Sequence, residues 1–177
     1  STRKESSAAS DVYKRQLNTM ISRQLDSEKS QIRIMERSPK SSIRIFSESM
    51  FKSGFISSTQ RKILQNWFDL INNSGSVNLE IDAHIYVRTS VPIALDRVSF
   101  RDRAGEKCLT EDYAKQLDTE HEHWLLQRDT SDKDLAQLAK VLVINGDKLG
   151  KDILEDYEHA VDWIIEKKVE RDGIWIQ

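Results

Sequence analysis

The sequence predicts an α/β fold in which a parallel sheet is flanked by helices. Short β-branched or apolar runs at 83–88 and 139–145 indicate strands, and the segments around them carry apolar residues at helical spacing. The run at 139–145 is nearly continuous in apolar residues, as expected for a strand covered on both faces. Strands that alternate with helices are joined by right-handed crossovers, and such crossovers produce a parallel sheet.

The composition fits one globular domain with a substantial core. The chain has 177 residues, of which 38% are hydrophobic and 32% charged, and its net charge is -2. Such a charge provides no bulk positive field, and no apolar stretch approaches the roughly 18 residues of a membrane-spanning helix. We therefore expect neither nucleic acid nor a membrane as a partner. The single cysteine, Cys108, excludes an internal disulfide and any metal site made of several cysteines.

Residues 1–16 are predicted to be a disordered leader because they are polar and have no hydrophobic period. Residues 6–16 also resemble, residue for residue, the translation of a transposase adapter used in preparing sequencing libraries. We interpret the leader as an artefact of that adapter and exclude it from reasoning about the fold. The domain then comprises residues 17–177, and we expect the native chain to begin upstream of position 17.

The first half of the domain is predicted to be mostly helical. A polar helix around 17–25 precedes a strand at 31–36, where apolar and polar residues alternate. Apolar residues at helical spacing predict two further helices, over 43–54 and 63–71, and each ends near a glycine.

The second half continues the alternation of strand and helix. Pro92 suits the first turn of a helix that follows the strand at 83–88 and runs towards Arg101. Thr110 is suited to the N-cap of the next helix. The last helix carries an apolar stripe that we expect to pack against the sheet. Its members are Leu149, Ile153, Tyr157, Val161, Ile164 and Ile165. Three strands are few for such a fold, which indicates a missing N-terminal part.

Two charged clusters are candidates for a site, because ligands of α/β sheets bind near the carboxyl ends of the strands. Glu36 and Arg37 follow the strand predicted at 31–36, and the alternative interpretation is a solvated or capping pair. Arg97, Arg101 and Arg103 form the second cluster. Arginine forks match phosphate oxygens, so this cluster suits a phosphoryl group, whereas the alternative is a solvated polar turn.

Three other features are interpreted as structural. The segment 146–152 imitates a phosphate-binding loop, but it has three residues rather than four between its glycines and Asp152 where Ser or Thr is needed. His121 and His123 are two positions apart on a predicted helix and point in different directions, so we expect a helix-surface role rather than metal binding. The four tryptophans are expected to serve packing.

Several short motifs follow one another along the chain. They are Met35-Glu36-Arg37-Ser38, Phe46, Phe51-Lys52-Ser53-Gly54, Asn66-Trp67-Phe68-Asp69, Arg101-Asp102-Arg103 with Glu106, and His121-Glu122-His123-Trp124-Leu125. In this order and spacing they resemble the deoxynucleoside kinase family over about residues 17–168. The small residue at Ser42 is similar to the mitochondrial thymidine kinase and insect multisubstrate types. We therefore favour pyrimidine deoxynucleosides, thymidine or deoxycytidine, as substrates.

The resemblance implies a P-loop kinase that transfers the γ-phosphate of ATP to the 5′-hydroxyl of a deoxynucleoside in nucleotide salvage, with magnesium. It also implies a homodimer and a cytoplasmic or mitochondrial location, which the native N-terminus would decide. The first strand, the Gly-rich phosphate loop and the catalytic carboxylate of such a kinase have no counterpart in this sequence. We expect them upstream, and we expect the chain as it stands to be inactive because the triphosphate lacks its cradle.

The resemblance also implies roles for the first group of site residues. Arg37 resembles the family arginine that orients the catalytic carboxylate and the 5′-oxygen, and Glu36 its neighbour near the magnesium ion. Phe46 occupies the place of the aromatic residue that stacks on the base, with Ser42 nearby in the substrate site. Glu106 resembles the lid carboxylate that contacts the 3′-hydroxyl of the sugar.

The remaining assignments concern ATP. Arg97, Arg101 and Arg103 resemble the helix and lid arginines that close on the phosphates. Asn145 and Asp147 would lie where the family holds the adenine.

Departures from the family pattern leave the substrate range open. They are Pro39, Ile43 in place of an arginine, and Ala104-Gly105 in an otherwise acidic lid. The alternative function is that of a noncatalytic, kinase-derived structural subunit of the mitochondrial complex I type. Such a subunit has no need of the lid residues, so their presence favours an enzyme.

Overall fold

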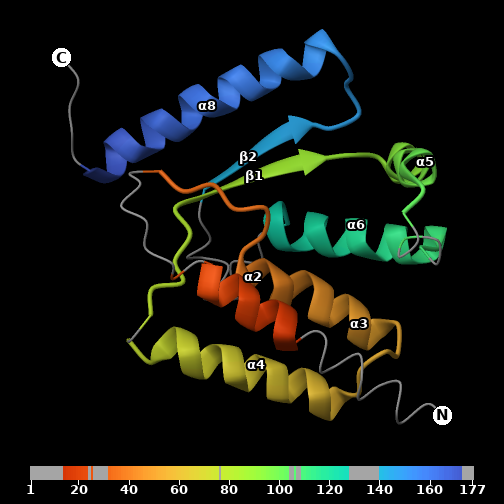
Figure 1. The fold of residues 1–177 in the computed structure, drawn as a ribbon, viewed down its shortest axis with the longest axis vertical. Helices are drawn as coiled ribbons and strands as arrows, with labels where there is room; N and C mark the ends of the chain where they lie inside the picture. Colours follow the sequence, from red (N-terminus) through yellow and green to blue (C-terminus); the bar gives the residue numbers. More distant parts are fainter. Residues whose placement is uncertain are drawn as a thin grey trace. The chain divides into compact units, whose positions relative to one another are not determined.

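The computed structural model describes residues 14–23, 25, 32–75, 77–103, 106, 109–127 and 140–172. The described parts are helices and one pair of strands (Figure 1). The chain divides into two compact units. The first comprises Ser1–Glu80 and Thr119–Trp124, and the second comprises Ile81–Asp118 and Leu125–Gln177.

A continuous helical segment lies at the centre of the first unit. It consists of α2 (Pro39–Ser41), the π-helix η1 (Ser42–Ser47) and α3 (Glu48–Lys52). Ser38 and Ser41 start it with a capping box, in which each hydroxyl oxygen accepts the other residue's backbone N–H at 3.0 and 3.1 Å. The helix predicted over 43–54 is therefore confirmed, although it begins earlier and contains a π-helical turn. Gly54 follows its end with a φ of 74°, a conformation that favours glycine.

Two other helices complete the described helices of this unit before residue 80. Residues 14–23 are helical, and α4 spans Ser58–Asn73. A second capping box starts α4, with the Gln60 N–H donating to the Ser57 hydroxyl at 3.2 Å. Both helices agree with the sequence prediction.

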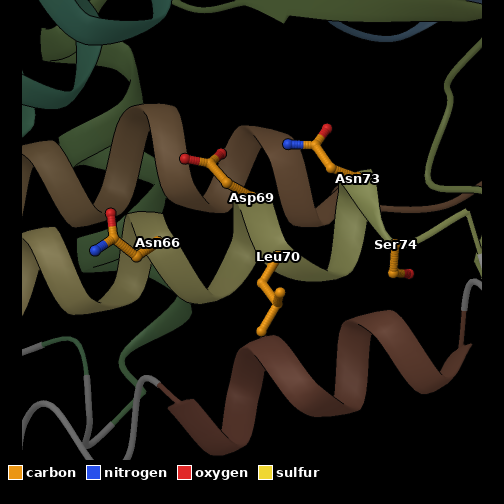
Figure 2. Close-up of a pocket in the computed structure, with 5 residues that line it drawn as sticks. All are labelled: Asn66, Asp69, Leu70, Asn73 and Ser74. Carbon is orange, nitrogen blue, oxygen red and sulfur yellow. The ribbon is translucent and has the colours of Figure 1, made fainter.

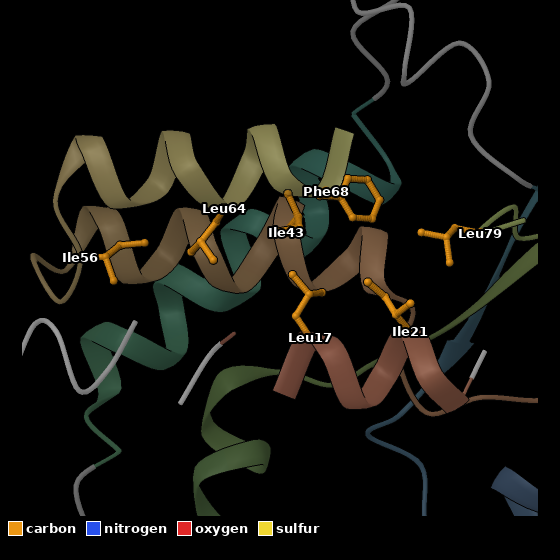
Figure 3. Close-up of a cluster of buried hydrophobic side chains, with 7 residues drawn as sticks. All are labelled: Leu17, Ile21, Ile43, Ile56, Leu64, Phe68 and Leu79. Atoms are coloured by element: carbon orange, nitrogen blue, oxygen red, sulfur yellow. The ribbon is translucent and has the colours of Figure 1, made fainter. Parts of the chain in front are cut away.

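The core of the first unit joins the three helical segments. Its buried members, shown in Figure 3, are Leu17, Ile21, Ile43, Ile56, Leu64, Phe68 and Leu79. Burial of each large apolar side chain stabilises the fold by roughly 1.5–3 kcal/mol. The cluster therefore fixes the helical segment that carries Phe46 against α4 and the helix at 14–23.

The strand predicted at 31–36 is wrong. Residues 32–35 form no strand in the structure, and the side chains of Ile32 and Ile34 are exposed. Alternation favours a strand only where a neighbouring strand supplies the ladder of hydrogen bonds, and the described residues place no strand beside this segment.

The second unit contains a parallel pair of strands, β1 (Ala83–Arg88) and β2 (Lys140–Asn145), drawn as the two arrows in Figure 1. Their register runs from Ala83 opposite Lys140 to Arg88 opposite Asn145. Both strands match the runs predicted from the sequence, although residue 139 lies outside the described residues. Within the described part of the chain the sheet has two strands, so the α/β class is confirmed with a small sheet.

Helices α5 (Val91–Arg101), α6 (Glu111–Leu125) and α8 (Lys151–Asp172) follow the strands. Pro92 lies in the first turn of α5, as predicted. The Thr110 hydroxyl accepts the Tyr113 N–H at 3.2 Å, which confirms the predicted N-cap of α6. No helix of the described residues is both long and apolar enough to cross a membrane.

The stripe predicted on α8 is wrong for most of its members. Tyr157, Val161 and Ile165 are exposed, whereas Ala160 is buried. Helix α8 contacts β2 and β1. Its less exposed face contains Ala160 together with the half-buried Ile153, Trp163 and Ile164, rather than the exposed members of the stripe. Leu149, which precedes the helix, is also exposed.

Candidate functional site

Phe46, Arg37 and His121 form a cluster around one aromatic ring in the first unit. The guanidinium carbon of Arg37 lies 4.4 Å from the centroid of the Phe46 ring, in a cation–π arrangement. The His121 ring meets the Phe46 ring edge-on, with centroids 6.1 Å apart and an interplanar angle of 87°. The structure therefore brings together two predicted site residues and a histidine that the sequence analysis assigned only to a helix surface.

Ser42 and Glu36 lie close to Arg37 and Phe46 in the sequence, but they differ in burial. Ser42 is buried at the start of η1, and its hydroxyl donates to the Met20 sulfur at 3.2 Å. Glu36 is exposed. A single exposed carboxylate suits magnesium, which is commonly held by one or two carboxylates together with substrate phosphates. Elsewhere too, the described residues contain no group of three His, Cys, Asp or Glu side chains placed to hold a metal ion.

Lys52 and Glu120 form an ion pair beside the cluster that sequence reasoning missed. The Lys52 Nζ lies 2.5 Å from the Glu120 Oε1, and the Glu120 side chain is only 8% exposed. The pair ties α3 to Thr119–Trp124, the part of α6 that carries His121. Spacing along the chain gives no signal for a contact between residues 68 positions apart.

Arg101, Arg103 and Glu106 gather at the end of α5 in the second unit. The Nε and Nη2 of Arg101 both donate to the Glu106 Oε2, at 3.0 and 2.7 Å. Arg103 Nη1 lies 3.9 Å from the other carboxylate oxygen. Asp102 ends the helix in the left-handed conformation, with a φ of 43°, and turns the chain between the two arginines. The proximity that the sequence predicted for these three residues is present.

Arg97 has other hydrogen-bond partners than Arg101 and Arg103. Its Nη1 donates to the carbonyl of Gly146 at 2.7 Å, and its Nη2 donates to the carbonyl of Lys148 at 3.5 Å. Arg97 therefore contacts the loop after β2, whereas Arg101 bonds to Glu106.

Asn145 is the last residue of β2 and Asp147 lies in the loop that follows, and both use a side-chain oxygen within the protein. The Asn145 Oδ1 accepts the backbone N–H of Asp147 at 3.0 Å, and the Asp147 Oδ1 accepts the N–H of Ser90 at 2.7 Å. Between them, Gly146 donates its N–H to the Arg88 carbonyl at 2.7 Å. A Cβ at Gly146 would lie 2.1 Å from the Thr89 Oγ1, so only glycine fits without a shift.

A shallow depression of about 380 Å³ lies along α4, away from these clusters in sequence (Figure 2). Its lining residues are Asn66, Asp69, Leu70, Asn73 and Ser74. Asp69 accepts a hydrogen bond from the Gln65 amide at 2.8 Å, and Leu70 is exposed. None of the site residues predicted from the sequence lines it.

The family of the chain is settled by comparison with known proteins. A family model described as deoxynucleoside kinase matches residues 5–170, which is most of the sequence. The chain belongs to the deoxynucleoside kinase family. Deoxynucleoside kinases are phosphotransferases that use ATP as the phosphate donor, generally with magnesium.

Two relatives show how much of such a kinase the chain represents. It is 31% identical to the deoxycytidine kinase of Bos taurus over 153 residues, which is 86% of this chain and 56% of the relative. It is also 31% identical to the mitochondrial thymidine kinase 2 of Homo sapiens over 147 residues, or 83% of this chain and 53% of the relative. The chain therefore spans about half the length of these relatives.

Proposed function

We propose that the whole protein transfers the γ-phosphate of ATP to the 5′-hydroxyl of a deoxynucleoside, with thymidine and deoxycytidine preferred. The observation that carries this proposal is the cluster of Arg101, Arg103 and Glu106. Phosphoryl transfer needs positive charge held in place around the moving group more than it needs covalent help. Two arginines beside one carboxylate supply that charge, and the Glu106 carboxylate contacts both of them before the phosphates arrive.

The substrate side of the proposal uses the cluster in the first unit. Phe46 offers a flat apolar ring for the base, and Arg37 and Glu36 supply the charged groups for the 5′-hydroxyl and the metal. Magnesium, when bound, neutralises charge on the phosphates. Ser42 is a small residue in the same segment, which supports a site that accepts pyrimidine bases.

The ATP side uses the loop after β2. Asn145 and Asp147 lie in that loop and, in this proposal, beside the adenine. The 177 residues contain no Gly-rich phosphate loop, so we expect no transfer by this chain alone.

Transfer of labelled phosphate from ATP tests the proposal. The whole protein is incubated with each of the four deoxynucleosides, and we expect faster product formation with thymidine and deoxycytidine. Arg103→Ala should lower kcat by about a hundredfold or more, with the melting temperature unchanged. Lys115→Ala, which removes an exposed cation of α6, is the matched control. No product from any nucleoside would overturn the proposal and favour the noncatalytic structural subunit.

We propose further that the protein is a homodimer. Support comes from α4, where Ile63 and Leu70 are large, apolar and exposed one above the other, two turns apart. Leu70→Asp should shift the molar mass in light scattering from dimer to monomer. Leu154→Asp, at another exposed leucine on α8, should not. A monomeric wild-type protein would contradict the proposal.

A further inference from the structure

Three backbone hydrogen bonds and one ion pair hold the loop after β2. The N–H groups of Gly146, Asp147 and Lys148 donate in turn to the Arg88 carbonyl, the Asn145 side chain and the Asn145 carbonyl, at 2.7, 3.0 and 3.4 Å. The Lys148 Nζ lies 2.9 Å from the Asp156 carboxylate on α8. The backbone N–H groups of residues 146–148 are therefore all bonded within the protein.

Arg97 donates hydrogen bonds to two carbonyl oxygens of the same loop. Its two terminal nitrogens reach the carbonyl oxygens of Gly146 and Lys148, two residues apart in the loop. The guanidinium is planar and holds its donors in a fixed fork, so two simultaneous bonds define where both carbonyls point. Arg97 is half-buried, which keeps these bonds from full competition with water.

Residues 97 and 101 share one face of α5, but their partners give them different roles. Arg101 donates to the Glu106 carboxylate, which also lies near Arg103. An incoming phosphate group offers Arg101 the same kind of charged acceptor. Arg97 would have to release two backbone carbonyls before it reached a phosphate. That release would leave the carbonyls of a half-buried loop without their charged donor.

We propose that Arg97 is a positioning residue for the nucleotide site rather than one of the arginines that close on the phosphates. It fixes the carbonyls of Gly146 and Lys148 and thereby sets the conformation of the loop that carries Asn145 and Asp147. This inference rests on the proposed function in so far as the loop receives the adenine of ATP. The fixed loop itself follows from the hydrogen bonds alone.

Hydrogen exchange and kinetics of Arg97→Ala in the whole protein test the two parts separately. Loss of the clamp should speed exchange of the amides of residues 146–148 by about tenfold. The KM for ATP should rise by about tenfold, whereas the KM for the nucleoside and the melting temperature should stay unchanged. Arg97→Lys, which keeps the charge but not the fork, should recover only part of the ATP affinity. Lys115→Ala should leave the exchange rates of residues 146–148 and both KM values unchanged.

Unchanged exchange in Arg97→Ala would overturn the positioning role. A fall in kcat at an unchanged KM for ATP would also overturn it, because that result assigns Arg97 to the transferring phosphate. Faster exchange in a protein that binds no magnesium–ATP would support the clamp and overturn the proposed function instead.

Discussion

The Arg37 guanidinium covers the Phe46 ring, its central carbon 4.4 Å from the ring centroid. One face of the ring is thus covered by a cation, and the His121 ring lies nearly perpendicular to it, with centroids 6.1 Å apart. A base that stacks on the covered face must displace Arg37. Displacement would free the Arg37 guanidinium from the ring when the base binds. Base binding would then be coupled to the positioning of the Arg37 charge near the 5′-hydroxyl.

Replacement of Phe46 separates a stacking role from a packing role. We expect Phe46→Leu to raise the KM for the nucleoside by about tenfold or more, because base–aromatic stacking contributes about 1–3 kcal/mol. Phe51→Leu is the matched control, since Phe51 also lies beneath a guanidinium, that of Arg61 at 4.6 Å. Steady-state kinetics and thermal melts of both variants provide the measurement. Equal changes in KM would count against stacking at Phe46.

The family resemblance predicts that Glu106 contacts the 3′-hydroxyl, and an analogue tests that prediction. Glu106→Gln should raise the KM for a 2′-deoxynucleoside by about tenfold, because a charged hydrogen-bond acceptor is lost. The same change should leave the KM for the 2′,3′-dideoxy analogue unchanged, since that substrate has no group to lose. A parallel rise for both substrates would show instead that Glu106 acts by holding Arg101.

Gly146→Ala should destabilise the second unit. The added Cβ would lie 2.1 Å from the Thr89 Oγ1 and 3.0 Å from the Arg88 carbonyl, so the loop or the end of β1 must shift. We expect a loss of about 1–3 kcal/mol in urea unfolding. Gly150→Ala is a useful comparison, because its φ of 62° is strained for alanine while the surrounding space is open. An unchanged midpoint for Gly146→Ala would contradict the close approach.

The ion pair of Lys52 and Glu120 predicts an asymmetry between its two partners. Lys52→Met leaves the buried Glu120 carboxylate without its counter-ion, and we expect a loss of about 1–3 kcal/mol in unfolding free energy. Glu120→Gln removes the buried charge and leaves the ammonium exposed, so it should cost less. Denaturant titrations of both single variants measure the difference, and a greater loss from Glu120→Gln would refute the expectation.

The start of α6 carries a pH-dependent contribution. A hydrogen bond from Lys115, reinforced by charge attraction, lowers the pKa of Glu111. A lowered folded-state pKa adds stability that is present above the unfolded pKa and is lost as the pH falls through the folded pKa. Lys115→Met should return the pKa of Glu111 towards the ordinary glutamate value. A carbon-detected NMR titration checks this, and an unaltered titration midpoint would contradict it.

Elements with local signals could be predicted from the sequence. The β-branched run at 83–88, Pro92 in the first turn of α5 and Thr110 at the cap of α6 each act within a few residues, and each is confirmed. The grouping of Arg101 with Arg103 and Glu106 was predictable for the same reason, because the three residues are close along the chain.

Features decided by distant partners could not be predicted in this way. Residues 31–36 alternate like a strand, but no strand among the described residues pairs with them. The buried position of Ala160 on α8 lies outside the apolar stripe that the sequence pattern marks. The Arg97 fork points to loop carbonyls 49 and 51 positions away, and the His121 ring meets the Phe46 ring across 75 positions. Periodicity carries no information about such contacts.

The π-helical turn Ser42–Ser47 has a consequence for how related sequences should be aligned. A π-helix closes its hydrogen bonds over five residues rather than four, so this stretch holds more residues per turn than the α-helices on either side. Because a π-helical stretch winds through a smaller angle per residue than an α-helix, removing one residue and restoring an α-helical turn would keep α3 nearly in register with α2. Met50 and Phe51 would then still face the core they pack against. Alignments of homologues can therefore place a single-residue gap within Ser42–Ser47 without displacing the core residues of α3.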